Sequence, residues 1–302
     1  MDQTNEPNFR AGYVAIVGEP NVGKSTLMNR LVGARLSIVT RKPQTTRKSV
    51  LGIVSNDDAQ IVFVDTPGVL TPAYLLQEKL VGYVADAVRD ADVILLMLDA
   101  NHPTLERIAA TPLGDVREFG KPVILLLNKM DAMVRKEEAL PIIERFAAMD
   151  FFEEIVPVSA LDGENTDRII PSIIERLPKG HPFYDPDVLS RQPERFFVAE
   201  MIREQILLGF RKEIPYSVEV DIIEFKEREQ PQKTFIHAEI VVERETQKGI
   251  LIGKKGEALR NLGSASRKTI EEFLDRPIYL ELFVKVRKNW RSDENRLNSY
   301  GY

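Results

Sequence analysis

Short apolar runs alternate with amphipathic stretches of helical length through the first half of the chain. Six of these runs are rich in valine, isoleucine and leucine, which is typical of strands buried on both faces of a parallel sheet. They span residues 13–17, 50–54, 61–64, 93–98, 123–127 and 155–158. Because helical segments separate most of them, the pattern predicts an α/β domain with a doubly wound, mostly parallel sheet.

One pair of runs departs from this alternation. Only residues 55–60 separate the runs at 50–54 and 61–64, and this connection is too short for a crossover helix. The two runs are therefore expected to form a hairpin, which places one antiparallel strand at an edge of the sheet.

The pattern changes after residue 178, where proline, glycine and charged residues interrupt the helical periodicity. We interpret 179–194 as a linker between a domain at 11–178 and a second domain at 195–302, with 1–10 as a flexible N-terminus. A chain of 302 residues is long enough for two such domains.

The second domain is expected to be a smaller α+β unit, because both helical and strand periodicities occur in it. Its predicted elements are a helix at 196–210, strands at 216–225 and 234–242, a helix at 257–274 and a strand at 278–286.

Composition narrows the possible classes of function. The chain has no cysteine, which excludes disulfide partners and thiol catalysis and fits a reducing cytoplasm. Its three histidines are scattered, which disfavours a zinc site. No apolar stretch approaches the ~20 residues of a membrane-spanning helix. We therefore expect a soluble, cytoplasmic protein that is at most peripheral to the inner face of the cell membrane.

Charge is distributed unevenly along the chain, whose net charge is -5. Residues 195–302 carry 20 Lys and Arg against 18 Asp and Glu, and within them residues 248–291 carry 11 against 5. A basic segment in an acidic protein indicates a polyanionic partner, and a solvated basic face is the alternative.

A phosphate-binding loop follows the first predicted strand directly. Residues 18–26 read Gly-Glu-Pro-Asn-Val-Gly-Lys-Ser-Thr, a complete G-x-x-x-x-G-K-S/T motif, and the preceding strand disfavours a chance glycine turn. The glycines let backbone N–H groups point at an anion, Lys24 adds a charge on the terminal phosphates, and the Ser25 hydroxyl suits Mg²⁺. The residues expected to bind a nucleoside triphosphate here are Gly18, Asn21, Gly23, Lys24, Ser25 and Thr26.

Two further motifs indicate the nucleotide. In Asp65-Thr-Pro-Gly68, the carboxylate is placed to hold the Mg²⁺ shell and Gly68 allows a backbone N–H to approach the terminal phosphate. In Asn128-Lys-Met-Asp131, the carboxylate of Asp131 can accept hydrogen bonds from the ring N–H and the exocyclic amino group of guanine. Adenine lacks that pair of donors, so the motif predicts GTP.

The rest of the base site is expected to come from the neighbouring positions. Lys129 is predicted to pack over the phosphate loop and the base. Ser159-Ala160 follows the sixth run, and the backbone N–H of Ala160 is predicted to reach the guanine oxygen. The expected base-binding residues are thus Asn128, Lys129, Asp131, Ser159 and Ala160.

Taken in order, these motifs and the segment Pro43-Gln-Thr-Thr-Arg47 resemble the translation-factor-type GTPases. In that family a switch threonine closes on Mg²⁺ when the third phosphate is present. Thr46 matches this threonine best and Thr45 is the alternative. The resemblance implies that Ser25, Thr46 and Asp65 hold Mg²⁺. It also implies that hydrolysis depends on Lys24, Thr46, Gly68 and Asn21.

One residue departs from the family pattern. Ras-like members carry a glutamine after the glycine of D-x-x-G, whereas this chain has Val69. We therefore expect hydrolysis to be slow or to use another device. Asn21 resembles the residue that coordinates K⁺ in place of an arginine finger in a bacterial subset of these GTPases, and a simple turn residue is the alternative.

A second motif lies in the basic segment. Ile252-Gly-Lys-Lys-Gly256 places two lysines between two glycines, and we interpret it as a loop between a strand and a helix. Such a loop allows close approach of an RNA backbone, and a plain turn is the alternative. With its flanking elements it resembles the bacterial KH domain, which grips about four single-stranded nucleotides. The residues expected to bind RNA are Ile252, Gly253, Lys254, Lys255 and Gly256.

The last predicted strand adds two cations to this site. Its alternation points Val284 and Val286 inward and Lys285 and Arg287 outward, where they are expected to follow an RNA backbone. The alternative role of these lysine and arginine side chains is to prevent aggregation at an edge strand. Trp290 is interpreted as a packing residue rather than a base-stacking one.

The order of GTPase domain, linker and KH domain resembles the Era family of bacterial ribosome-assembly GTPases over nearly the whole chain. The resemblance implies hydrolysis of GTP to GDP with Mg²⁺, and assembly of the 30S ribosomal subunit by a monomer. It also implies binding of single-stranded RNA near the 3′ end of the small-subunit ribosomal RNA. An RNA scaffold with a structural nucleotide and a membrane-associated regulatory GTPase are the alternatives.

Overall fold

The computed structural model describes residues 9–228 and 232–302, which form two compact units. Of the described residues, 9–37, 46–72 and 77–191 form the first unit, and 38–45, 73–76, 192–228 and 232–302 form the second. The segment 179–191, interpreted above as part of a linker, thus groups with the first unit. Of the N-terminus expected to be flexible, residues 1–8 lie outside the described residues, and Arg10 already belongs to a strand.

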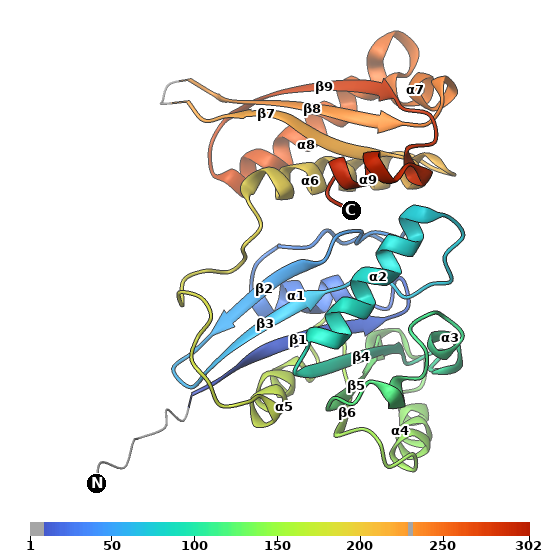
Figure 1. Ribbon diagram of the computed structural model, residues 1–302, viewed down its shortest axis with the longest axis vertical. Coiled ribbons are helices and arrows are strands. Elements are labelled where there is room, and N and C mark those ends of the chain that lie inside the picture. The colour runs from blue at the N-terminus through green and yellow to red at the C-terminus, as the bar shows by residue number, and fades with distance from the viewer. Residues whose placement is uncertain (1–8, 229–231) are drawn as a thin grey trace. The chain divides into compact units, whose positions relative to one another are not determined.

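The first unit is an α/β structure in which strands and helices alternate (Figure 1). Its strands are β1 (Arg10–Gly18), β2 (Val50–Ser55), β3 (Ala59–Asp65), β4 (Val93–Asp99), β5 (Val123–Asn128) and β6 (Glu154–Pro157). Its helices are α1 (Lys24–Val32), α2 (Leu75–Asp90), α3 (Glu106–Ala109), α4 (Ala139–Ala147) and α5 (Ile169–Arg176). All six predicted strands are present.

The six strands form one sheet in the order β2-β3-β1-β4-β5-β6. Every neighbouring pair is parallel except β2 and β3, which pair antiparallel with Val50 opposite Asp65. The predicted doubly wound sheet with one antiparallel edge strand is therefore confirmed. Because parallel strands end at the same edge, the residues after β1, β3, β5 and β6 meet there.

The core of this unit explains why the strands read as continuous apolar runs. Every residue of β5 is buried, and β4 is buried from Val93 to Leu98. The cluster of buried side chains includes Val17, Leu96 and Leu127 from three neighbouring strands. Burial on both faces removes the need for polar residues between the apolar ones.

The second unit is an α+β structure with a three-stranded sheet in the order β7-β8-β9. Its elements are α6 (Glu194–Gly209), β7 (Glu219–Lys226), β8 (Thr234–Val242), α7 (Glu245–Ile252), α8 (Glu257–Leu274), β9 (Ile278–Val286) and α9 (Glu294–Ser299). β8 pairs antiparallel with β7 and parallel with β9. Trp290 is fully buried and donates a hydrogen bond from Nε1 to the oxygen of Ser217 at 3.1 Å, as a packing residue does.

One sequence-based expectation about this unit is wrong. The motif at residues 252–256 lies between two helices, α7 and α8, and not between a strand and a helix. The apolar run ending at Ile252 resembles a strand in sequence, but a helix starts at Glu245, where Gln247 Oε1 accepts the N–H groups of Glu243 and Arg244 at 2.9 and 3.0 Å. Leu251 is fully buried, so packing stabilises this short helix.

Within the described ranges, no helix is both long and apolar enough to cross a membrane.

Candidate functional site

The phosphate loop runs from the end of β1 to the start of α1, as its motif predicts. Gly23 adopts a φ of 108°, and a Cβ atom there would lie 2.3 Å from Nδ2 of Asn128. At Gly18, a Cβ atom would lie 2.5 Å from the oxygen of Met97. Both positions therefore require glycine because neighbouring groups approach the backbone. Asn21 is exposed with a φ of 62°, and Thr26 lies in the first turn of α1.

Lys24 is buried at the start of α1. Its Nζ donates hydrogen bonds to the oxygens of Gly18 and Glu19, each at 3.0 Å, so the loop curls around the ammonium group. Burial lowers the pKa of Lys24 to about 8, although the charges of Asp65 and Glu19 raise it. An anion bound in the loop would favour the charged form of this lysine.

Three side chains predicted to hold Mg²⁺ meet beside this loop. Ser25 Oγ donates to Asp65 Oδ2 at 2.7 Å and lies 2.9 Å from Thr46 Oγ1. Thr46 Oγ1 also donates to Asp65 Oδ2, at 3.4 Å. The other carboxylate oxygen, Asp65 Oδ1, is buried and has no hydrogen-bond partner among the described residues.

This donor set suits a magnesium ion. Mg²⁺ prefers oxygen ligands and binds through few side chains, keeping several waters. Burial raises the pKa of Asp65, although Lys24 and Ser25 lower it. A bound cation would favour the ionised carboxylate, and the unpartnered Oδ1 leaves it an acceptor for a metal or its water.

Of the two candidate switch threonines, Thr46 is the one at the carboxylate. Thr45 Oγ1 instead donates to the oxygen of Lys42 at 2.6 Å and lies 2.8 Å from Thr40 Oγ1. The geometry thus favours Thr46 over Thr45 as a metal ligand.

The segment after Asp65 lies against the phosphate loop. A Cβ atom on Gly68 would lie 2.7 Å from three atoms of Pro20, so only glycine fits this approach. Val69 donates its N–H to the oxygen of Gly18 at 3.1 Å, and its side chain is buried in the core cluster. A buried valine cannot orient a water molecule.

Asn128, at the end of β5, connects three parts of the site. Its Nδ2 donates to the oxygen of Val22 in the phosphate loop at 2.7 Å. Its Oδ1 accepts the N–H of Ala160 at 2.8 Å. The N–H expected to reach the guanine oxygen is therefore engaged by Asn128 in this structure.

Asp131 and Ser159 also lie together. Ser159 Oγ donates to Asp131 Oδ1 at 2.7 Å, which fixes the carboxylate and leaves Oδ2 for a base. Lys129, predicted to pack over the loop and the base, donates from Nζ to Asp99 Oδ2 at 2.8 Å. Sequence reasoning missed Asp99, although its position at the end of β4 is a signal for it.

Left-handed backbone occurs at three positions of the lysine-glycine segment 252–256 in the second unit. Gly253, Lys255 and Gly256 all have positive φ values, of 72°, 52° and 76°. A Cβ atom on Gly253 would lie 2.6 Å from Cβ of Ala258. Lys254 and Lys255 are exposed, Ile252 is half-buried, and no side chain caps the start of α8. The lysines and the first N–H groups of α8 are thus available to phosphate.

The two cations predicted along β9 differ in their surroundings. Lys285 Nζ contacts both carboxylate oxygens of Glu239 on β8, at 2.9 and 2.8 Å. Arg287 is exposed, just beyond the end of the strand. Arg287 is therefore the stronger candidate for contact with an RNA backbone.

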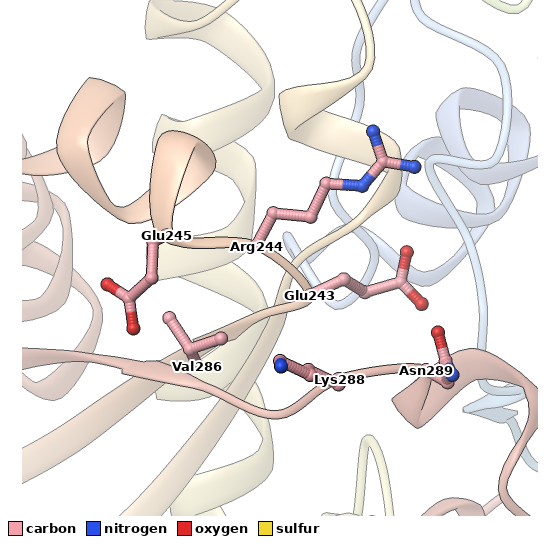
Figure 2. Close-up of a pocket in the computed structure, with 6 residues that line it drawn as sticks. All are labelled: Glu243, Arg244, Glu245, Val286, Lys288 and Asn289. Carbon is pink, nitrogen blue, oxygen red and sulfur yellow. The ribbon is translucent and has the colours of Figure 1, made fainter.

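A pocket of about 310 Å³ lies where the start of α7 meets the end of β9. Figure 2 shows that its side chains come from two segments. They are Glu243, Arg244 and Glu245 from one segment and Val286, Lys288 and Asn289 from the other. Sequence reasoning missed this pocket, because it depends on how the two segments meet.

Comparison with known proteins agrees with the fold of both units. A family model described as a 50S ribosome-binding GTPase matches residues 13–129, and a KH domain model matches residues 213–291. A protein of Syntrophus aciditrophicus named GTPase Era is 42% identical over 97% of this chain and 95% of its own length.

Two solved structures are similar over 97% of this chain and 99% of their own, each at 40% identity. One is a variant of Aquifex aeolicus Era bound to GDP and AlF4⁻, with a TM-score of 0.92. The other is Era in complex with MgGDPNP and nucleotides 1506–1542 of 16S ribosomal RNA, with a TM-score of 0.93.

Proposed function

The chain belongs to the Era family of GTPases, and we propose that it hydrolyses GTP at the site between β1 and α1 and binds small-subunit ribosomal RNA through its KH domain. The observation that carries the proposal is the convergence of Ser25, Thr46 and Asp65 beside the buried Lys24. We assign this cluster to the terminal phosphates and their Mg²⁺.

In this proposal, hydrolysis depends on positioning and charge rather than on covalent chemistry. Lys24 leaves the oxygens of Gly18 and Glu19 and binds the terminal phosphates. Gly68 presents a backbone N–H to the third phosphate. When bound through Ser25, Thr46 and Asp65, Mg²⁺ neutralises charge on the phosphate oxygens.

Guanine selection rests on Asp131. Its Oδ1 already accepts the Ser159 hydroxyl, so the carboxylate is held in one orientation before the base arrives. We propose that the base takes the remaining acceptor positions. Since Ala160 donates its N–H to Asn128, the guanine oxygen shares that N–H or displaces the amide oxygen from it.

We propose that a K⁺ ion bound near Asn21 assists hydrolysis. Val69 is buried in the core, so water orientation has to come from elsewhere. Asn21 is exposed at the top of the phosphate loop, and its left-handed backbone is also what a turn requires. A comparison of rates in K⁺ and Na⁺ separates these two roles.

We propose that single-stranded RNA near the 3′ end of the small-subunit ribosomal RNA binds at residues 252–256, and that the protein acts in 30S subunit assembly. The support is the exposed Lys254 and Lys255 and the similar Era structure that contains nucleotides 1506–1542 of 16S ribosomal RNA. Crosslinking in cells, followed by sequencing of the bound RNA, tests this assignment. Recovery of unrelated RNA would contradict it.

We also propose that the nucleotide controls RNA binding. The chain passes from the second unit to the first between Thr45 and Thr46. Within the second unit, Arg203 of α6 donates to the oxygens of Gln44, at 3.4 Å, and Thr45. When a triphosphate draws Thr46 to the metal, it therefore pulls on Gln44 and Thr45, which Arg203 of α6 binds. Equal RNA affinity with GDP and with a non-hydrolysable GTP analogue would rule out this coupling.

A further inference from the structure

Arg30, in the last turn of α1, contacts the loop that follows β6. Its Nε donates to the oxygen of Ala160 at 2.8 Å, and its Nη2 donates to the oxygen of Leu161. The fork of the guanidinium thus engages two successive carbonyl groups, which a lysine cannot do with the same geometry. None of the nucleotide motifs includes Arg30.

The contact of Arg30 with this loop requires a glycine at position 163. Gly163 has a φ of 92°, and a Cβ atom there would lie 2.6 Å from Nη1 of Arg30. The turn is closed by the N–H of Gly163, which donates to the oxygen of Ser159 at 2.7 Å. The loop therefore leaves room for the guanidinium at a position where a side chain would displace it.

The two carbonyl groups that Arg30 binds lie in or next to the segment Ser159-Ala160 of the base site. Ala160 offers its carbonyl to Arg30 and its N–H to the base side, where Asn128 accepts it. The preceding residue, Ser159, holds Asp131. The carbonyl of Ala160 belongs to the peptide group after this residue and its N–H to the one before, so contacts with both restrict the two soft backbone dihedral angles of Ala160.

We propose that Arg30 is a positioning residue for guanine. It fixes the 159–163 loop so that Ser159 stays on Asp131 and Ala160 faces the base. It also connects that loop to α1, whose first residue is the phosphate-binding Lys24. The inference rests on the guanine site proposed above.

The test is the rate of GDP dissociation from full-length Arg30→Ala, measured by displacement of a fluorescent GDP analogue. We expect dissociation to be about tenfold faster than in the wild-type protein, the equivalent of one charge-assisted hydrogen bond. The KM for GTP should rise by a similar factor while kcat stays within about twofold, because the groups at the phosphates are unchanged. Arg30→Lys, which can restore one contact, should fall between the two.

Three comparisons make the result decisive. Arg89→Ala removes another exposed arginine, which pairs with Asp86 and Asp90 on the surface, and should leave GDP dissociation unchanged. A merely structural role of Arg30 predicts a lower melting temperature and lower kcat with unchanged GDP dissociation, which would overturn the proposal.

Asp131→Ala tests the guanine site separately from the positioning role of Arg30. If it accelerates dissociation and Arg30→Ala does not, the positioning role alone is wrong, whereas no effect of either variant overturns the guanine site as well.

A double-mutant cycle tests the contact itself. Gly163→Ala should accelerate GDP dissociation because the new Cβ displaces the guanidinium of Arg30. In the Arg30→Ala background the same substitution should have a smaller effect, since only the backbone strain of alanine at a φ of 92° remains. Additive effects of the two substitutions would contradict the proposal.

Discussion

The side-chain amide of Asn128 donates to the carbonyl oxygen of Val22 at 2.7 Å, and so joins the strand that carries the guanine motif to the phosphate loop. The same side chain accepts the N–H of Ala160. One residue therefore sets the distance between the two ends of the nucleotide site. Gly23 gives it room, because any Cβ there would collide with Nδ2.

Asn128→Ala should weaken GDP binding roughly 10- to 100-fold, because it leaves the Val22 oxygen and the Ala160 N–H without their partner. Calorimetric titration with GDP measures the change. Arg117→Ala, which removes an exposed pair with Asp115, is the matched control and should bind GDP normally. Unchanged affinity in Asn128→Ala would show that the amide does not organise the site.

GDP affinity should fall at alkaline pH because of Lys24. Its pKa in the free protein is about 8, so the ammonium loses its proton above that pH, whereas bound phosphate favours the protonated form. Binding then requires proton uptake, and the dissociation constant for GDP should rise roughly tenfold between pH 7 and pH 9. Lys24→Ala should bind weakly without this dependence. A flat profile in the wild-type protein would contradict the role of Lys24.

Asp65→Asn should raise the thermal stability of the protein and abolish its GTP hydrolysis. Burial raises the pKa of Asp65 in the folded state above its unfolded value, so the ionised group at neutral pH costs stability, and this cost is absent only at lower pH. The variant should melt at a higher temperature than the wild type in EDTA without nucleotide, yet lose Mg²⁺-dependent GTP hydrolysis. Thermal melts and phosphate release measure the two effects. A destabilised variant with normal hydrolysis would contradict both assignments.

The double substitution Lys254→Ala with Lys255→Ala should weaken RNA binding and leave GTP hydrolysis unchanged. Loss of two phosphate contacts reduces the slope of log K against log salt by about 1.4 for a single strand. Lys285→Ala is the matched control within the same unit, because Glu239 already neutralises that lysine. Titration of a single-stranded RNA at several salt concentrations provides the slope. Equal slopes for all three proteins would exclude the loop as the RNA site.

Hydrolysis should be faster in K⁺ than in Na⁺ at equal ionic strength, and Asn21→Ala should remove the difference. The variant should still bind GDP, since Asn21 is exposed and the loop backbone supplies the phosphate contacts. Equal rates of the wild-type protein in the two salts would leave Asn21 as a turn residue.

The sequence was sufficient for features that depend on local order along the chain. Buried strands read as apolar runs, and motifs at strand ends meet because parallel strands share an edge. This reasoning predicted that Ser25 and Asp65 serve one site, and their side chains lie within hydrogen-bond distance of each other. It also identified the hairpin, since a short connection permits only an antiparallel pair.

Features that depend on tertiary neighbours were not accessible in this way. The pairing of Lys285 with Glu239 follows from the register between β8 and β9, which an alternating pattern does not fix. The β-propensity of the run ending at Ile252 predicts a strand, whereas the structure has a helix there, because packing of the buried Leu251 outweighs that propensity. Arg30 lies 130 positions from Ala160, and no motif connects them.

Release of phosphate from GTP and from ATP by the full chain, under multiple-turnover conditions with Mg²⁺ and K⁺, tests the central claim most directly. The geometry at Lys24, Asp65 and Asp131 predicts many turnovers with GTP and no release above background with ATP. Equal rates with the two nucleotides, or no more than one phosphate released per protein molecule, would contradict it.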